Sequence, residues 1–264
     1  MKILFIGDIV GKAGRRMVEE YLSYMVATHQ VAFCVANCEN AAGGMGITPE
    51  IADSFFKLGV HILTSGNHIW NKKEILDYLD QQDRLLRPAN YPPGVPGKGS
   101  VLCQLPGGEK VAIINLQGRI FMDAIDCPFQ AADRELNQLQ SKTKIILVDM
   151  HAETTSEKSA MGWYLDGRVS AVLGTHTHIP TADERVLPGG TAFITDVGMT
   201  GPVDSVIGME KEPALRRFLT CIHQKFNPAK GPGQLNSVLL DIDPSTGRAR
   251  DIIRVRIDQN SEGQ

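Results

Sequence analysis

The chain has 264 residues, of which 42% are hydrophobic and 22% are charged, and its formal net charge at pH 7 is −3. Because we find no linker-like stretch and no internal repeat, we expect a single domain over residues 1–264. The small net charge and the lack of a strong basic patch argue against a long nucleic-acid duplex as partner. A small anionic substrate is still compatible if bound metal ions supply positive charge locally.

Cysteine usage and the apolar runs predict a cytoplasmic protein. The five cysteines form no Cys-x-x-Cys pair, so we expect Cys34 and Cys38 to be small core residues, not disulfide or zinc ligands. The first apolar run is too short for a signal peptide, and no run approaches the roughly 18 apolar residues of a membrane span. We therefore expect no membrane contact.

The first part of the chain alternates strand-like and helix-like segments. Short apolar runs bounded by polar residues predict buried strands. In chain order we predict strand 2–7, helix 13–29, strand 31–37, helix 49–58, strand 60–64 and helix 71–80. Helix 49–58 has the clearest boundaries, because Thr48 can cap it, Pro49 suits its first position and Gly59 can end it.

The pattern changes at segment 88–99, whose many prolines and glycines predict a surface loop. The segments that follow are predicted as strands 100–105 and 110–116, helix 129–141, strand 144–149, helix 155–165, strands 168–173 and 191–195, helix 212–225, and strands 235–242 and 249–257. In helix 212–225, Phe218 and Leu219 are expected to pack in the core. This order predicts an α/β fold, a four-layer α/β/β/α sandwich with two mixed sheets.

Residue types that bind metal ions follow several of the predicted strands. Functional groups in α/β sheets gather beyond the carboxyl ends of strands, so we expect these side chains at one sheet edge. The candidate ligands are Asp8, Glu39, Asn40, Asn67, His151, His176 and His178. Oxygen and imidazole ligands without thiolate suit iron, manganese or zinc better than calcium or magnesium. We expect two divalent or trivalent ions, with iron as first choice and manganese or zinc as alternatives.

A bridging carboxylate would let two such ions lie about 3.5–4 Å apart and clamp a phosphoryl group. On an extended segment, His176 and His178 would point the same way, but where a strand leaves into a loop they could splay toward two metals. Glu153 and Asp196 could orient imidazoles or lie on the surface. Arg119 could contact phosphate or form a surface salt bridge.

The triplet Gly66-Asn67-His68 resembles the Gly-Asn-His motif of the calcineurin-like metallophosphoesterases. Segment 174–178 resembles their Gly-His-x-His motif, except that Thr175 separates the glycine from the first histidine. The chain departs from the superfamily at Val10, where a histidine is usual, and at Cys38-Glu39-Asn40, where Gly-Asp is usual. The superfamily implies the layered sandwich predicted above.

Longer motifs are similar to one subfamily, the bacterial 2',3'-cyclic-nucleotide 2'-phosphodiesterases. They lie at residues 7–11, 37–44, 87–92, 151–158 and 195–201, and the resemblance runs from residue 2 to about residue 210. It implies one metal site formed by Asp8, Asn40 and His178, and a second formed by Asn67, His151 and His176. Glu39 would bridge the two, and Asn40 would replace the histidine absent at Val10.

The resemblance also implies a reaction. A metal-bound hydroxide would attack the phosphorus, and His68 as general acid would protonate the departing 2'-oxygen, so that a 2',3'-cyclic nucleotide opens to a 3'-nucleotide. Such a small phosphoester is the expected substrate, with RNA ends as further candidates. A homo-oligomer is expected on base rates alone.

Two other functions stay open at this point. One is a broader phosphodiesterase or phosphatase that acts on RNA ends, nucleotides or phosphoproteins with the same two metals. The other is a regulatory protein that binds a nucleotide or RNA and hydrolyses it slowly. Turnover of 2',3'-cyclic AMP against a panel of phosphoesters would separate them.

Overall fold

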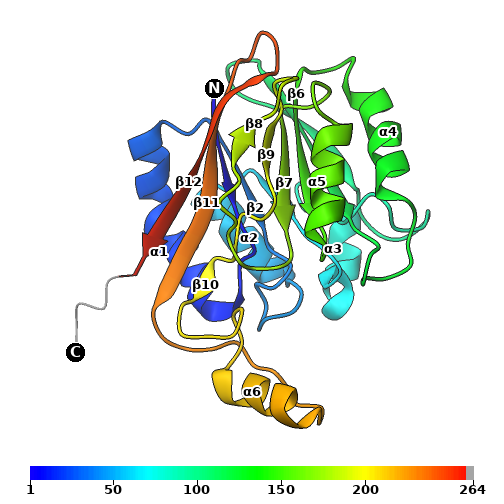
Figure 1. Cartoon of the computed structure of the whole chain (residues 1–264). Helices are drawn as coiled ribbons and strands as arrows, with labels where there is room; N and C mark the ends of the chain where they lie inside the picture. The colour runs from blue at the N-terminus through cyan, green and yellow to red at the C-terminus, as the bar shows by residue number, and fades with distance from the viewer. Residues whose placement is uncertain (260–264) are drawn as a thin grey trace.

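The first of two sheets combines strands from the start and the end of the chain (Figure 1). The computed structural model describes residues 1–259. The sheet has the order β10-β11-β1-β2-β3, and β12 pairs with β11. Its strands are β1 (Lys2–Ile6), β2 (Phe33–Asn37), β3 (Ile62–Thr64), β10 (Gly201–Pro202), β11 (Gly233–Ile242) and β12 (Ala249–Asp258). Since β1 is parallel to β2 and antiparallel to β11, the sheet is mixed.

The second sheet has the order β4-β5-β6-β7-β9-β8. Its strands are β4 (Ser100–Gln104), β5 (Lys110–Gln117), β6 (Ile145–His151), β7 (Ala171–Thr175), β8 (Arg185–Val186) and β9 (Ala192–Ile194). The inner strands β5, β6, β7 and β9 are parallel, and the edge strands β4 and β8 are antiparallel to their neighbours. The parallel strands therefore end at one common edge.

Helices cover the outer faces of both sheets, and alternate residues of each strand separate the inner core from the outer ones. On β1, Ile3 and Phe5 pack in the core between the sheets, whereas Leu4 and Ile6 pack against helices. The helices on this side are α1 (Gly11–His29), α2 (Pro49–Leu58) and α3 (Ile75–Gln81). Those on the second sheet are α4 (Pro128–Leu139) and α5 (Thr155–Tyr164). The predicted four-layer α/β/β/α sandwich is confirmed.

Most predicted elements are present, with shifted ends. Helix α2 has the predicted bounds, and the Ile51 N–H donates to the Thr48 hydroxyl while Gly59 is left-handed at φ 105°. The predicted helix 71–80 begins only at Ile75, because a 3₁₀ turn, η1 (Ile69–Asn71), precedes it. Strands β8 and β10 have two residues each, too few to give a periodic pattern.

The predicted helix 212–225 is α6 (Lys211–Thr220), and it ends early because Cys221 is left-handed at φ 56°. The prediction that Phe218 and Leu219 pack in the core is wrong, since they are 78% and 83% exposed. In Figure 1, α6 lies apart from both sheets, below the body of the molecule.

The cysteine prediction agrees with the structure, because Cys34 and Cys38 are buried and free. Within residues 1–259, no helix has the length and apolar character needed to cross a membrane. The single domain over residues 1–264 stays a prediction, and residues 260–264 lie outside the described part.

Candidate metal centre

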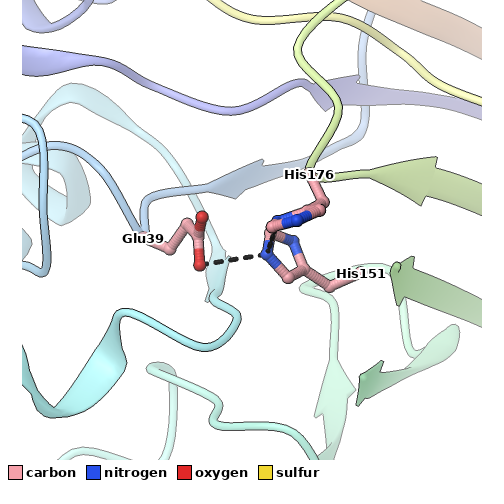
Figure 2. A group of neighbouring side chains, drawn as sticks. All are labelled: Glu39, His151 and His176. Carbon is pink, nitrogen blue, oxygen red and sulfur yellow. Dashed lines mark hydrogen bonds and ion pairs between the residues drawn. The ribbon is translucent and has the colours of Figure 1, made fainter. Parts of the chain in front are cut away.

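The carboxyl ends of strands from both sheets bring all the predicted ligands to one place. Asp8 follows β1, Glu39 and Asn40 follow β2, and Asn67 follows β3, whereas His151 ends β6 and the pair His176 and His178 follows β7. Their ligand atoms form two clusters, Glu39 with His151 and His176, and Asp8 with Glu39 and His178, each within 4.8 Å. Figure 2 shows the first cluster, in which both imidazoles lie beside the Glu39 carboxylate. Glu39 therefore belongs to both.

The two asparagines lie in contact with these clusters. The Asn67 Oδ1 lies 3.2 Å from the His151 Nε2, and the Asn40 Nδ2 lies 3.1 Å from the His178 Nε2. Both amides thus present polar atoms beside imidazole nitrogens of the clusters. The structure thus brings together all the residues that were predicted from the sequence as metal ligands.

Each imidazole is held from outside by a protein oxygen, which leaves its other nitrogen facing the centre. His151 contacts the Thr175 hydroxyl through Nδ1 (2.8 Å), and His178 contacts the Ile207 carbonyl through Nδ1 (2.8 Å). His176 contacts Glu153 through Nε2 (3.0 Å). Such oxygens fix the tautomer, so that Nε2 of His151 and His178 and Nδ1 of His176 present lone pairs inward. The splayed arrangement of the two histidines after β7 is the one the structure adopts.

A buried network that sequence reasoning missed supports the centre from below. The Asp149 carboxylate accepts hydrogen bonds from Thr64 (2.5 Å), Asn37 (2.9 Å) and Thr175 (2.7 Å). These residues come from β6, β3, β2 and β7, so the network joins the two sheets. Because the Thr175 hydroxyl donates to Asp149, it accepts from His151. Thr175 thus links the network to a candidate ligand.

A close approach explains the glycine of the Gly66-Asn67-His68 triplet. A Cβ at Gly66 would overlap the His151 imidazole and the Glu39 carboxylate. Only glycine lets the backbone after β3 pass this near to two candidate ligands.

The buried carboxylates and imidazoles of the centre have shifted pKa values that indicate a site for a cation. Burial raises the pKa of Asp8 to about 6, and its Oδ1 is buried without a hydrogen-bond partner among the described residues. Burial opposes charge on His151, but the Glu39 carboxylate outweighs it and raises the pKa of His151 to about 9. Burial and the neighbouring His151 lower the pKa of His176 to about 3. The buried carboxylates thus hold a proton on His151, and a bound cation would replace that proton and free its Nε2 as a ligand. Together with the unpartnered oxygen of Asp8, these residues form an oxygen and imidazole donor set suited to metal ions.

His68 lies at the mouth of the centre and not inside it. Its Nδ1 is 2.7 Å from the Asn40 Oδ1 and 3.4 Å from the Glu39 Oε1, and its side chain is 27% exposed. It is therefore open to solvent and to a substrate while it still touches two candidate ligands.

The loop with His176 and His178 has an unfavourable backbone that a buried ion pair holds in place. Both residues have positive φ, 96° and 68°, which costs a non-glycine residue about 1–2 kcal/mol. Buried Lys158 donates to the Thr175 carbonyl (3.1 Å), the Thr177 hydroxyl (3.2 Å) and Asp196 (2.8 Å). Asp196 in turn accepts from the Thr177 N–H (3.1 Å). Glu153 and Asp196 were both candidates to orient an imidazole. Among the described residues, Glu153 contacts His176, whereas Asp196 instead binds Thr177 and so holds the loop.

We expect Lys158→Met to lower the free energy of unfolding by about 3–5 kcal/mol, because it leaves the Asp196 carboxylate buried without its partner. Urea denaturation of the metal-free protein measures this loss. The double variant Lys158→Met/Asp196→Asn should recover part of it, and Lys57→Met, on the exposed face of α2, should change little. Equal effects of Lys158→Met and Lys57→Met would contradict the role of the ion pair.

Arg119 makes no contact with this centre among the described residues. Its backbone N–H donates to Glu157 (3.1 Å), which fixes the start of the loop after β5. Among the described residues, no contact supports either phosphate binding or a surface salt bridge for its side chain.

Comparisons with known proteins give the same family over nearly the whole chain. The family model described as YmdB-like protein matches residues 4–255. A Bacillus subtilis protein named 2',3'-cyclic-nucleotide 2'-phosphodiesterase is 48% identical over 260 residues, which cover 98% of each chain.

Two solved structures are also similar to this chain. A Thermus thermophilus protein described as hypothetical has a TM-score of 0.92 at 43% identity, covering 98% of this chain and 100% of the other. A Mycoplasma pneumoniae protein described as a novel phosphatase has a TM-score of 0.93 at 33% identity, covering 99% and 95%.

Proposed function

This chain belongs to the YmdB-like protein family, and on that premise we propose that it hydrolyses 2',3'-cyclic nucleotides to 3'-nucleotides at a dimetal centre. The observation that carries this proposal is the Glu39 carboxylate, which belongs to both candidate clusters and is fully buried. A carboxylate shared in this way suits a bridge between two cations. The name of the Bacillus subtilis relative supports the choice of substrate.

The remaining ligands divide between the two sites. Asp8, Asn40 and His178 would hold one ion, and Asn67, His151 and His176 the other, on either side of Glu39. The contacts of Asn40 with His178 and of Asn67 with His151 support this division. Two ions bound there would supply the positive charge that clamps the phosphoryl oxygens and lowers the pKa of water.

The protein's own part in the reaction is to place the phosphate and to deliver a proton. Water loses one proton to solvent as its oxygen forms a bond to phosphorus, and the bond from phosphorus to the 2'-oxygen breaks. The imidazolium of His68 gives its proton to the departing 2'-oxygen, so the phosphate stays on the 3'-oxygen. The exposed position of His68, beside but not among the candidate ligands, supports this role.

We also propose that the ions are iron, with manganese or zinc as alternatives, because the donors are oxygen and imidazole without thiolate. RNA ends are proposed as further substrates. A homo-oligomer and a cytoplasmic location stay predictions.

The test is turnover of 2',3'-cyclic AMP together with metal content per chain. We expect two metal ions, 3'-AMP as the product, loss of turnover on chelation, and recovery on adding iron, manganese or zinc. Faster hydrolysis of phosphomonoesters or linear diesters would favour the broader phosphatase function. Two bound metals without turnover on any of these substrates would favour a regulatory binding protein.

A further inference from the structure

A pocket of about 350 Å³ opens directly onto His68 and has two unlike sides. One side consists of residues of the candidate metal centre, among them Glu39, Asn40 and His178. The other side comes from the segment around α6, residues 206–226. The volume is near the lower end of the roughly 300–1,000 Å³ of small-molecule sites.

The side formed by the α6 segment is almost entirely apolar. Its lining residues are Val206, Ile207, Met209, Ala214, Arg217, Phe218 and Phe226. Ala214, Arg217 and Phe218 share one face of α6, because residues three and four apart are neighbours on a helix. The Arg217 guanidinium lies 5.7 Å from the centre of the Phe226 ring, so this side presents aromatic surface and one cation.

Within the described residues, one direct hydrogen bond joins the α6 segment to a candidate metal ligand. The His178 Nδ1–H donates to the Ile207 carbonyl at 2.8 Å. The apolar side thus begins at a candidate metal ligand and extends away from it along α6. Phe218 is 78% exposed although it lines the pocket, so much of its ring is free to contact a ligand.

From these observations we infer that the α6 segment is the nucleobase subsite, with Phe218 as its main stacking surface. The inference rests on the proposed function, in which the cyclic phosphate lies at the metal centre and His68. The base of such a substrate projects from the ribose on the side away from the phosphate, and the same pocket that holds His68 is lined by the apolar and aromatic residues of the α6 segment. Aromatic side chains stack on any of the four bases.

The chemistry of this side also sets the specificity. Among its described lining residues, only Arg217 has a side chain that donates strong hydrogen bonds, and none is a carboxylate or amide that could read a base edge. The four 2',3'-cyclic nucleotides should therefore have similar kcat/KM values. The enzyme should instead distinguish nucleotides from cyclic phosphates that lack a base.

The test compares 2',3'-cyclic AMP with methyl riboside 2,3-cyclic phosphate, which has a methoxy group in place of the base. In Phe218→Ala, the ratio of kcat/KM for the nucleotide to that for the base-free substrate should fall about 10-fold, the order expected for loss of one stacking contact. Phe218→Trp should keep the wild-type ratio. Calorimetric titration of the product 3'-AMP should show a matching loss of affinity in Phe218→Ala.

The matched control is Leu219→Ala, which removes a large apolar side chain from the next position of α6. Leu219 is 83% exposed and is not among the pocket-lining residues, so the ratio should not change. An unchanged ratio in Phe218→Ala, or equal falls in both variants, would overturn the subsite. If wild-type protein hydrolysed neither cyclic phosphate, the proposed function itself would fail, and the inference with it.

Discussion

Glu39→Ala is expected to abolish binding of both metal ions and to lower kcat/KM for 2',3'-cyclic AMP by more than the roughly 10–100-fold that loss of an outer partner costs. The Glu39 carboxylate belongs to both clusters, so its removal takes one donor from each site at once. It also lies 3.0 Å from the His151 Nε2, so the imidazole would lose its nearest anion as well. Elemental analysis after reconstitution measures the metals, and initial rates measure the activity.

Glu153→Ala is the matched control, because its half-exposed carboxylate contacts His176 from outside the clusters at 3.0 Å. We expect that variant to keep one ion at full affinity and to bind the other about 10–100-fold more weakly. Circular dichroism should show native secondary structure in both variants. Retention of two ions by Glu39→Ala would exclude the bridging role.

His68→Ala should keep both metal ions yet lower kcat for 2',3'-cyclic AMP by about 10²–10⁴-fold, the usual contribution of a general acid. The 2'-oxygen is a poor leaving group and needs a proton as its bond to phosphorus breaks. Bis-p-nitrophenyl phosphate releases a stable phenolate, so its turnover should fall much less. Parallel kinetics on the two substrates, with metal analysis of the same samples, make the measurement.

His29→Ala, at the end of α1 and away from the centre, is the control for histidine loss and should behave like wild type. Equal losses on the two substrates would mean that His68 positions the substrate without donating a proton. Loss of a metal ion in His68→Ala would instead make it a ligand.

The candidate ligands could be found from the sequence because strand ends are a local signal. Asp8, Glu39, Asn67 and His151 each end or closely follow a short apolar run. Parallel strands of one sheet end at a common edge, so the pattern predicts that the candidate ligands of each sheet lie together. That the edges of the two sheets meet was decided by how the sheets stack. The layered fold followed from the same runs, since each strand alternates between two buried faces.

The supporting contacts could not be found in this way. Thr175 looked like an extra residue in the Gly-His-x-His motif, yet it ends β7 and holds His151 from beneath. Lys158 and Asp196 are 38 positions apart, and nothing in either local pattern links them. Hydrogen bonds between distant segments depend on how the sheets stack, which residue order does not encode locally.

The sequence by itself determined approximately where the strands end and which metal-binding residue types follow them. Only the tertiary structure decided which imidazole nitrogen faces inward and whether Phe218 points into a core or a pocket. A helical period shows that apolar residues share one face, but the partner of that face is set by contacts with segments far away in the chain.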